Sequence, residues 1–135
     1  MAIGETYVNV NGRIVTEPER RELADGGESL GFLVISTERR FDKSTGEWVD
    51  GRRFSVWVTC WRKLARHVWQ SLRKGDDVMI SGRLRTREYE DGGKTRYTTE
   101  LDAYAVGPNL ARAIADVRRV RGGGNPVGET SVTAA

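Results

Sequence analysis

The sequence predicts an all-β domain with one helix, closed into a small five-stranded Greek-key barrel. Five segments show the alternating or continuous apolar pattern of β-strands, and one segment shows apolar residues at helical spacing. The helical segment falls between the third and the fourth strand. At 135 residues the chain is long enough for one domain with a hydrophobic core of its own.

The first two strands are predicted at 6–15 and 29–37. In the first, valine and isoleucine alternate with polar side chains, which is typical of a half-buried strand. Residues 16–28 contain a proline and a Gly-Gly pair, so we expect the chain to turn there. The second strand is apolar on both faces, with Leu33 and Ile35 on the outer one. It should therefore cover the core and also contact something outside it, such as a partner subunit.

The third strand is predicted at 52–61, after a polar loop or extended hairpin tip at 38–51. Successive side chains of a strand point to opposite faces. Trp57 and Trp61 therefore lie on one face, opposite a row expected to face the core: Phe54, Val56, Val58 and Cys60.

A helix is predicted at 62–75, with Trp69 in its packing stripe and Gly75 suited to the position after its end. Two strands, 76–90 and 94–106, follow and are joined by an Asp-Gly-Gly tip. The order β-β-β-α-β-β is the arrangement of an OB-fold, a barrel that commonly binds oligonucleotides.

Residues 1–108 are predicted to form this barrel domain and residues 109–135 a C-terminal extension. Within the extension, 107–120 could begin a short helix. The segment from about 121 to 135 is rich in glycine and poor in apolar residues, so we expect it to be largely disordered.

Composition excludes several classes of protein. No apolar run approaches the roughly 20 residues needed to span a bilayer, and the N-terminus lacks the pattern of a signal peptide. The single cysteine, Cys60, excludes an internal disulfide framework and a cysteine zinc cluster. The sequence therefore predicts a cytoplasmic protein with no cofactor, no metal and no membrane partner.

Positive charge is concentrated in the middle of the chain. Residues 39–96 hold 15 Lys/Arg against 8 Asp/Glu, and they also contain all four tryptophans. A local excess of this kind indicates a polyanionic partner, although a solvated charged face is an alternative.

One face of the fourth strand carries three arginines and a tyrosine: Arg83, Arg85, Arg87 and Tyr89. Such a row cannot lie in the core unless every charge is paired. Pairing with Glu100 and Asp102 of the fifth strand is the structural alternative. It would neutralise two of the arginines and leave one cation over, so we favour a binding face.

Single-stranded nucleic acid requires cations along its phosphates and flat aromatic faces for its unstacked bases. Trp57, Trp61 and Tyr89, interleaved with the arginine row, provide both. Duplex recognition would require a helix fit for the major groove, and the predicted helix uses its long face for packing. An aromatic subunit interface remains the alternative for Trp57 and Trp61.

Several blocks in sequence resemble bacterial single-stranded DNA-binding proteins: "STERRFDKSTGEW", "WRKLA", "SLRKGDDVMISGRLRTREYED" and "KTRYTTEL". The resemblance covers about residues 6–108. It implies an OB-fold assembled as a homotetramer in the bacterial cytoplasm, associated with the nucleoid. Such a protein binds and protects single-stranded DNA without sequence preference and without catalysis, in replication, recombination or repair.

The resemblance also implies binding roles for particular residues. Aromatic residues of the family match Trp61 and Tyr89, whereas the place of a loop tryptophan holds Arg40, with Phe41 beside it; either could take the stacking role. The complete set of candidate nucleic-acid contacts is Arg40, Phe41, Lys43, Trp57, Trp61, Lys63, Lys74, Arg83, Arg85, Arg87, Tyr89 and Arg96.

Family members typically end in an acidic tail that recruits other proteins. In this sequence Glu129 is the only acid among the last fifteen residues, so we expect no recruitment through such a tail. The sequence resembles a short paralogue in this respect.

Two other functions are alternatives. An enzyme would need convergent catalytic groups, but the one histidine, His67, has no partner at ligand or triad spacing. An OB-fold that binds RNA, or that mediates protein assembly, remains the alternative to single-stranded DNA binding.

Overall fold

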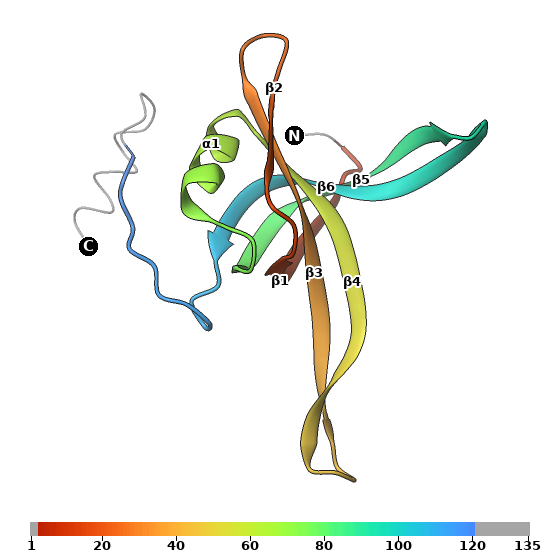
Figure 1. Ribbon diagram of the computed structural model, residues 1–135, viewed down its shortest axis with the longest axis vertical. Helices are drawn as coiled ribbons and strands as arrows, with labels where there is room; N and C mark the ends of the chain where they lie inside the picture. The colour runs from red at the N-terminus through yellow and green to blue at the C-terminus, as the bar shows by residue number, and fades with distance from the viewer. Residues whose placement is uncertain (1–2, 121–135) are drawn as a thin grey trace.

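The computed structural model describes residues 3–120. These residues form six strands and one helix (Figure 1). In chain order the elements are β1 (Thr6–Ile14), β2 (Glu19–Glu22), β3 (Glu28–Asp42), β4 (Glu47–Trp61), α1 (Arg62–Ser71), β5 (Asp77–Asp91) and β6 (Lys94–Pro108).

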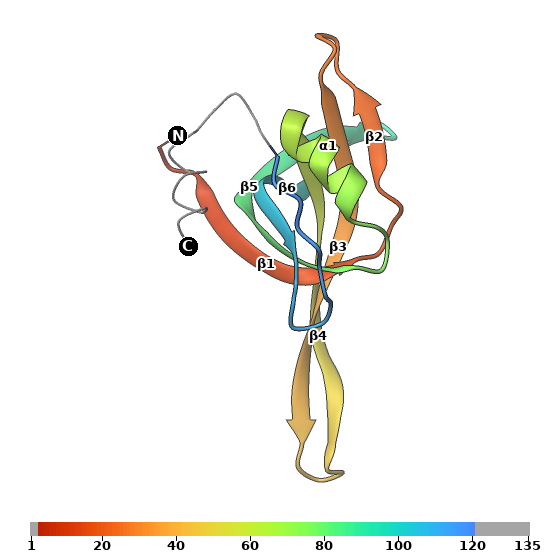
Figure 2. The same cartoon turned by 90° about the vertical axis from the view of Figure 1, so that its left-hand side faces the viewer.

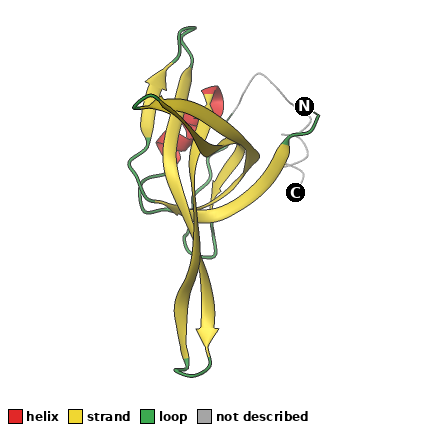
Figure 3. Ribbon diagram, turned by 90° about the vertical axis from the view of Figure 1, so that its right-hand side faces the viewer, coloured by secondary structure: helices red, strands yellow, loops and turns green. Residues whose placement is uncertain are grey.

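Five of the strands close into a barrel, seen in Figure 3. Their order is β1-β5-β6-β4-β3, and β1 pairs again with β3 where Arg13 lies opposite Ile35. The β4–β6 pairing is parallel, with Trp57 opposite Glu100, and the other pairings are antiparallel. The predicted five-stranded barrel with one helix is confirmed.

The core consists of alternating apolar side chains from the inner halves of the strands and from α1. Alternation directs every second residue of a strand inward, and the helix covers one end of the barrel beside β2 (Figure 2). Burial raises the pKa of the Cys60 thiol to about 12, so it stays protonated at neutral pH. The buried apolar residues are Val10, Ile14, Leu30, Phe32, Val34, Val56, Val58, Cys60, Ala65, Val68, Leu72, Val78, Ile80, Leu101 and Ala103.

Two hairpins continue the barrel strands beyond the core (Figure 1). The first, which we call the β3–β4 arm, contains residues 38–53. The sequence left a polar loop or an extended hairpin tip open for 38–51, and the structure has the extended hairpin, because the ladder continues to Asp42 and resumes at Glu47. The turn is only four residues long. Asp42 accepts hydrogen bonds there from the backbone N–H and the hydroxyl of Ser44, at 2.9 and 2.6 Å.

The prediction that Phe54 faces the core was wrong: its side chain is 46% exposed. Val56 and Val58, on the same side of β4, are buried as expected. The strand face was predicted correctly, but at residue 54 β4 has not yet entered the core, which it reaches at Val56. Phe54 instead borders a shallow cavity beside β1 with Val8 and Leu84.

Trp69 was predicted to be in the core, yet it is 39% exposed. The guanidinium of Arg20 lies 5.0 Å from the centroid of its ring. Arg20 belongs to β2, an edge strand paired with β3 in a segment that the sequence indicated as a turn. Trp69 is therefore covered in part by a cation instead of by apolar residues.

The helix also ends earlier than predicted, at Ser71 instead of just before Gly75. The Arg73 guanidinium donates to the carbonyls of Trp69 and Leu72, at 2.7 and 2.9 Å, so a side chain satisfies carbonyls that a further turn would have bonded.

The predicted short helix in 107–120 was also wrong. β6 continues to Pro108, and a turn at 110–112 is followed by chain without regular secondary structure to residue 120. The prediction of disorder for 121–135 lies outside the described residues. Within residues 3–120, no helix is both long and apolar enough to cross a membrane.

Candidate nucleic-acid interface

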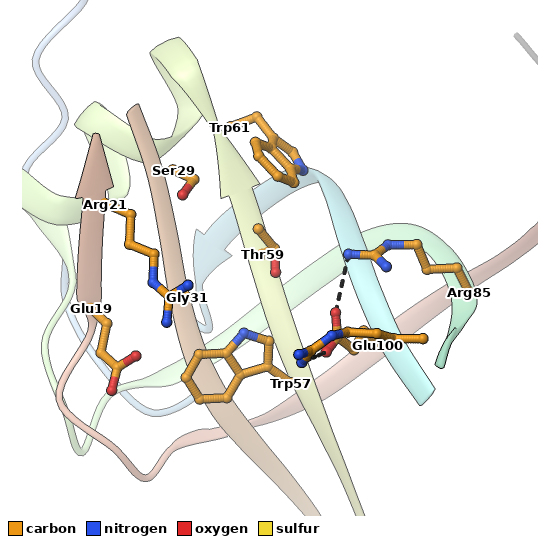
Figure 4. A pocket seen from close by; sticks show the side chains of 10 residues that line it. Glu19, Arg21, Ser29, Gly31, Trp57, Thr59, Trp61, Arg85 and Glu100 are labelled. Atoms are coloured by element: carbon orange, nitrogen blue, oxygen red, sulfur yellow. Dashed lines mark hydrogen bonds and ion pairs between the residues drawn. The ribbon is translucent and has the colours of Figure 1, made fainter. Parts of the chain in front are cut away.

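A groove crosses the outer face of the barrel over β2, β3, β4, β5 and β6. It has a volume of about 540 Å³. Figure 4 shows aromatic side chains from β4 between the charged side chains of β2 and those of β5 and β6. The lining residues are Glu19, Arg21, Ser29, Gly31, Trp57, Thr59, Trp61, Arg85, Arg87 and Glu100.

Trp57 and Trp61 both point into this groove, with Thr59 between them on the same face of β4 (Figure 4). Trp61 is 42% exposed and Trp57 is partly buried. The indole of Trp57 lies against the backbone of Gly31 on β3. A Cβ atom at residue 31 would approach the ring to 2.6 Å, so glycine is required for this position of the indole.

Trp61 is held at the junction of β4 and α1, where it is the residue that caps the helix. The next residue, Arg62, has a backbone φ of 56°, a positive value that is unusual for residues other than glycine. Its guanidinium lies beside Gly27 and donates a hydrogen bond to the Asp25 carboxylate at 2.7 Å. This bond, together with the N–H of Gly27, lowers the pKa of Asp25. The contact connects the β2–β3 turn to the residue beside Trp61.

The arginine row of β5 is paired with two buried carboxylates of β6. Arg85 lies at the centre and donates from Nε to Asp102 and from Nη2 to Glu100, both at 3.0 Å. Arg87 Nη1 lies 3.2 Å from the second oxygen of Glu100, and Arg83 Nε lies 3.4 Å from Asp102. The pairing weighed as the structural alternative is thus present, and it involves all three arginines. With three cations and two carboxylates, this network keeps one positive charge.

The outer residues of the arginine row lie on the hairpin of β5 and β6, which is the second hairpin that extends beyond the core. Tyr89 is 38% exposed, and the Arg87 guanidinium lies 5.7 Å from the centroid of its ring. Arg96 stands opposite Tyr89 in the ladder, where its Nε lies 3.5 Å from Asp91. The aromatic and cationic groups of the groove therefore continue along this hairpin.

The remaining candidates lie apart from the groove. Arg40, Phe41 and Lys43 belong to the β3–β4 arm. Lys63 is exposed on α1 and Lys74 is exposed in the turn after it. Neither lysine lines the groove.

Sequence reasoning missed several functional candidates. Trp48, 61% exposed, packs edge to face against Phe41 across the arm, with ring centroids 5.5 Å apart. Extending both strands to the Thr-Gly turn would have placed the two residues opposite one another. Arg21 and Glu19 were missed because their strand, β2, has no apolar alternation.

Among residues 3–120, no group of three or more His, Cys, Asp or Glu residues is arranged to hold a metal ion. The arrangement of the groove is suited to holding flat rings and anionic groups by stacking and ion pairing.

Comparison with known proteins agrees with this geometry. A model described as the single-strand binding protein family matches residues 6–108. The single-stranded DNA-binding protein of Corynebacterium glutamicum is 43% identical over 126 residues, which are 93% of this chain and 56% of that protein. Single-stranded DNA-binding protein 2 of Streptomyces coelicolor is also 43% identical, over 90% of this chain and 61% of its own length. The chain thus spans little more than half the length of these two relatives.

Two solved structures share the fold. One is the small single-stranded DNA-binding protein of Streptomyces coelicolor, 34% identical with a TM-score of 0.73; the match covers 82% of this chain and all of that one. The other is the second single-stranded DNA-binding protein of Mycobacterium smegmatis, 39% identical with a TM-score of 0.69. That match covers 85% of this chain and 99% of the solved chain. Because the family model covers most of the chain, the barrel is an OB-fold and the chain belongs to the single-strand binding protein family.

Proposed function

We propose that this chain binds single-stranded DNA without sequence preference and without catalysis, and so protects it in replication, recombination or repair in the bacterial nucleoid. The observation that carries the proposal is the groove, where Trp57 and Trp61 lie on one strand face beside Arg85 and Arg87. Stacking on an aromatic ring contributes about 1–3 kcal/mol per base and tolerates any sequence, because every base has a π-face.

The shape of the site supports a single strand over a duplex. Many duplex readers place a helix in the major groove. The apolar side chains of α1 are directed at the barrel, where Ala65 and Val68 are buried. The tryptophans offer flat faces, which bases present only when they are unstacked.

The β3–β4 arm extends this interface. Arg40, Phe41 and Lys43, together with Trp48, add cations and rings at a distance from the groove along the same two strands. We propose that a bound strand passes from the groove to this arm, and that Lys63 and Lys74 contribute long-range attraction from the helix side.

We propose further that the protein assembles as a homotetramer. Large apolar side chains are exposed on β1, β4, β5 and β6, away from the tryptophan groove. These side chains are Tyr7, Phe54, Met79 and Tyr104. Leu33 and Ile35, on the outer face of β3, are only partly buried. Light scattering of the purified protein coupled to size exclusion would give the number of subunits.

Titration with oligo(dT) at several salt concentrations tests the proposed binding. We expect quenching of tryptophan fluorescence, and a log–log salt dependence of affinity with a slope of about −0.7 for each phosphate neutralised. Affinity that ignores salt, with unchanged fluorescence, would exclude this interface. Competition with an oligo(U) of equal length distinguishes DNA binding from RNA binding. A pure assembly module would bind neither.

A further inference from the structure

Two buried carboxylates lie among the arginines of β5, and one of them, Glu100, lines the groove. Glu100 and Asp102 project from β6 among the arginines of β5, and Glu100 is opposite Trp57 in the parallel pairing of β4 with β6. Their side chains are 7% and 9% exposed, whereas the arginines that cover them are 37–56% exposed. A bound strand therefore meets the guanidinium groups first, and each of these already has an anionic partner.

The three arginines are not equivalent in this network. Arg85 bonds both carboxylates, so its departure would remove a partner from each of two buried charges. Arg83 and Arg87 each contact one carboxylate. If either of them turned away, that carboxylate would still keep Arg85. Turning away either end arginine therefore removes one ion contact, whereas turning away Arg85 removes two.

Arg87 is the end that faces the groove. It is the most exposed arginine of the three, at 56%, and it contacts a single oxygen of Glu100 at 3.2 Å. The same guanidinium lies over the ring of Tyr89. Glu100 therefore competes with an incoming phosphate for the Nη1 edge of this cation.

We propose that Glu100 limits the affinity of the groove for nucleic-acid phosphate. In the free protein it occupies Arg87, and a bound phosphodiester replaces it there while Arg85 keeps Glu100 neutralised. When the strand leaves, the Glu100–Arg87 pair forms again. Glu100 thus weakens binding and speeds release. This inference rests on the proposed binding of single-stranded DNA.

The variant E100Q tests the inference because it keeps the shape of the side chain and removes its charge. We expect the affinity for oligo(dT) to rise about tenfold through slower dissociation, and the salt slope to steepen by up to about 0.7. The matched control is E88Q, which changes the net charge equally from the opposite face of β5. The affinity of E88Q for oligo(dT) should stay within about twofold of the wild-type value. In an R87Q background, the gain from E100Q should be lost.

The outcomes separate the inference from the proposed function. A wild-type protein that does not bind oligo(dT) would refute the proposed function. A wild-type protein that binds, with an E100Q variant that binds equally or more weakly, would overturn the inference alone. If E100Q does not fold, ¹⁵N NMR of the arginine side chains in the wild-type protein tests the same exchange. On addition of oligo(dT) the Nη signals of Arg87, whose Nη1 pairs with Glu100, should shift more than the side-chain signals of Arg85. An equal or larger shift at Arg85, or no shift at Arg87, would overturn the inference.

Discussion

The groove and the β3–β4 arm have similar compositions and different construction. Both combine tryptophan with cations. In the groove, Trp57 lies on the backbone of Gly31, and Arg85 is held by two buried carboxylates. On the arm, Phe41 and Trp48 contact each other, and both are largely exposed. Because the groove is organised before a ligand arrives, binding there should lose less conformational entropy than binding on the arm. Residue types alone therefore do not determine how strongly a face binds.

The largest expected effect comes from deleting both groove tryptophans. In the W57A/W61A variant, two stacking faces are lost, at about 1–3 kcal/mol each, so the affinity for oligo(dT) should fall at least about thirtyfold. The matched arm variant, F41A/W48A, should lose less than about tenfold, because these exposed side chains lose more conformational entropy on binding than the tryptophans of the groove. Fluorescence anisotropy with a labelled oligonucleotide measures both. Equal losses would show that the construction of the two regions does not matter.

The second largest effect concerns stability, which a substitution in the groove should lower more than one on the arm. Replacing Arg85 by alanine removes the central partner of two buried carboxylates and should lower the free energy of unfolding by about 2 kcal/mol. The loss stays below that of a fully unpaired buried charge because Arg83 and Arg87 remain. On the arm, R40A should change stability by less than about 0.5 kcal/mol. Urea unfolding gives both values, and an R85A protein as stable as wild type would contradict the structural role of the network.

A smaller effect is expected from G31A. The added methyl group would meet the Trp57 ring at 2.6 Å, so the indole must move and its stacking face is misplaced. Loss of part of one stacking contact should reduce affinity about fivefold. The matched control is G107A, because a Cβ atom at that position would have nothing within 4 Å. Unchanged affinity in G31A would mean that Trp57 does not receive a base.

The smallest effect concerns pH. Hydrogen bonds from the Ser44 hydroxyl and backbone N–H lower the pKa of Asp42 below its usual value of 3.8. A lowered pKa adds stability that is complete above the ordinary value and is lost as the pH falls through the folded-state pKa. Acidification below pH 3.8 should therefore loosen the turn of the arm. Amide NMR of residues 43–46 between pH 5 and 2 would report this transition. A D42N variant should lack it, and a midpoint at or above pH 3.8 in the wild-type protein would be contrary to expectation.

Alternation along the strands was sufficient to predict the barrel and the row of arginines beside the tryptophans. It could not predict where a strand leaves the barrel, because the pattern gives the face of a residue and not its depth. Phe54 shows this limit, since it shares a face with Val56 but lies beyond the core.

Other features have no local signal at all. β2 is four consecutive charged residues, and its place depends on backbone pairing with β3. The exposure of Trp69 follows from that strand, because Arg20 covers part of a ring that helical spacing assigns to the core. Pairing of the arginines with Glu100 and Asp102 was foreseeable from the sequence. The division into an Arg85 that contacts both carboxylates and two neighbours that contact one each depends on distances that only the fold supplies.

Four strands of the barrel are each 15 residues long, and only their inner halves enter the core. The same strand therefore meets two independent selective demands along its length. Substitutions near the barrel are restricted by packing, whereas the outer half of each strand can vary in charge and aromatic content without endangering the fold. A lineage could thus change how such a protein holds its ligand by altering hairpin residues alone. An engineer could likewise place a fluorescent reporter at a hairpin tip while leaving the barrel sequence intact.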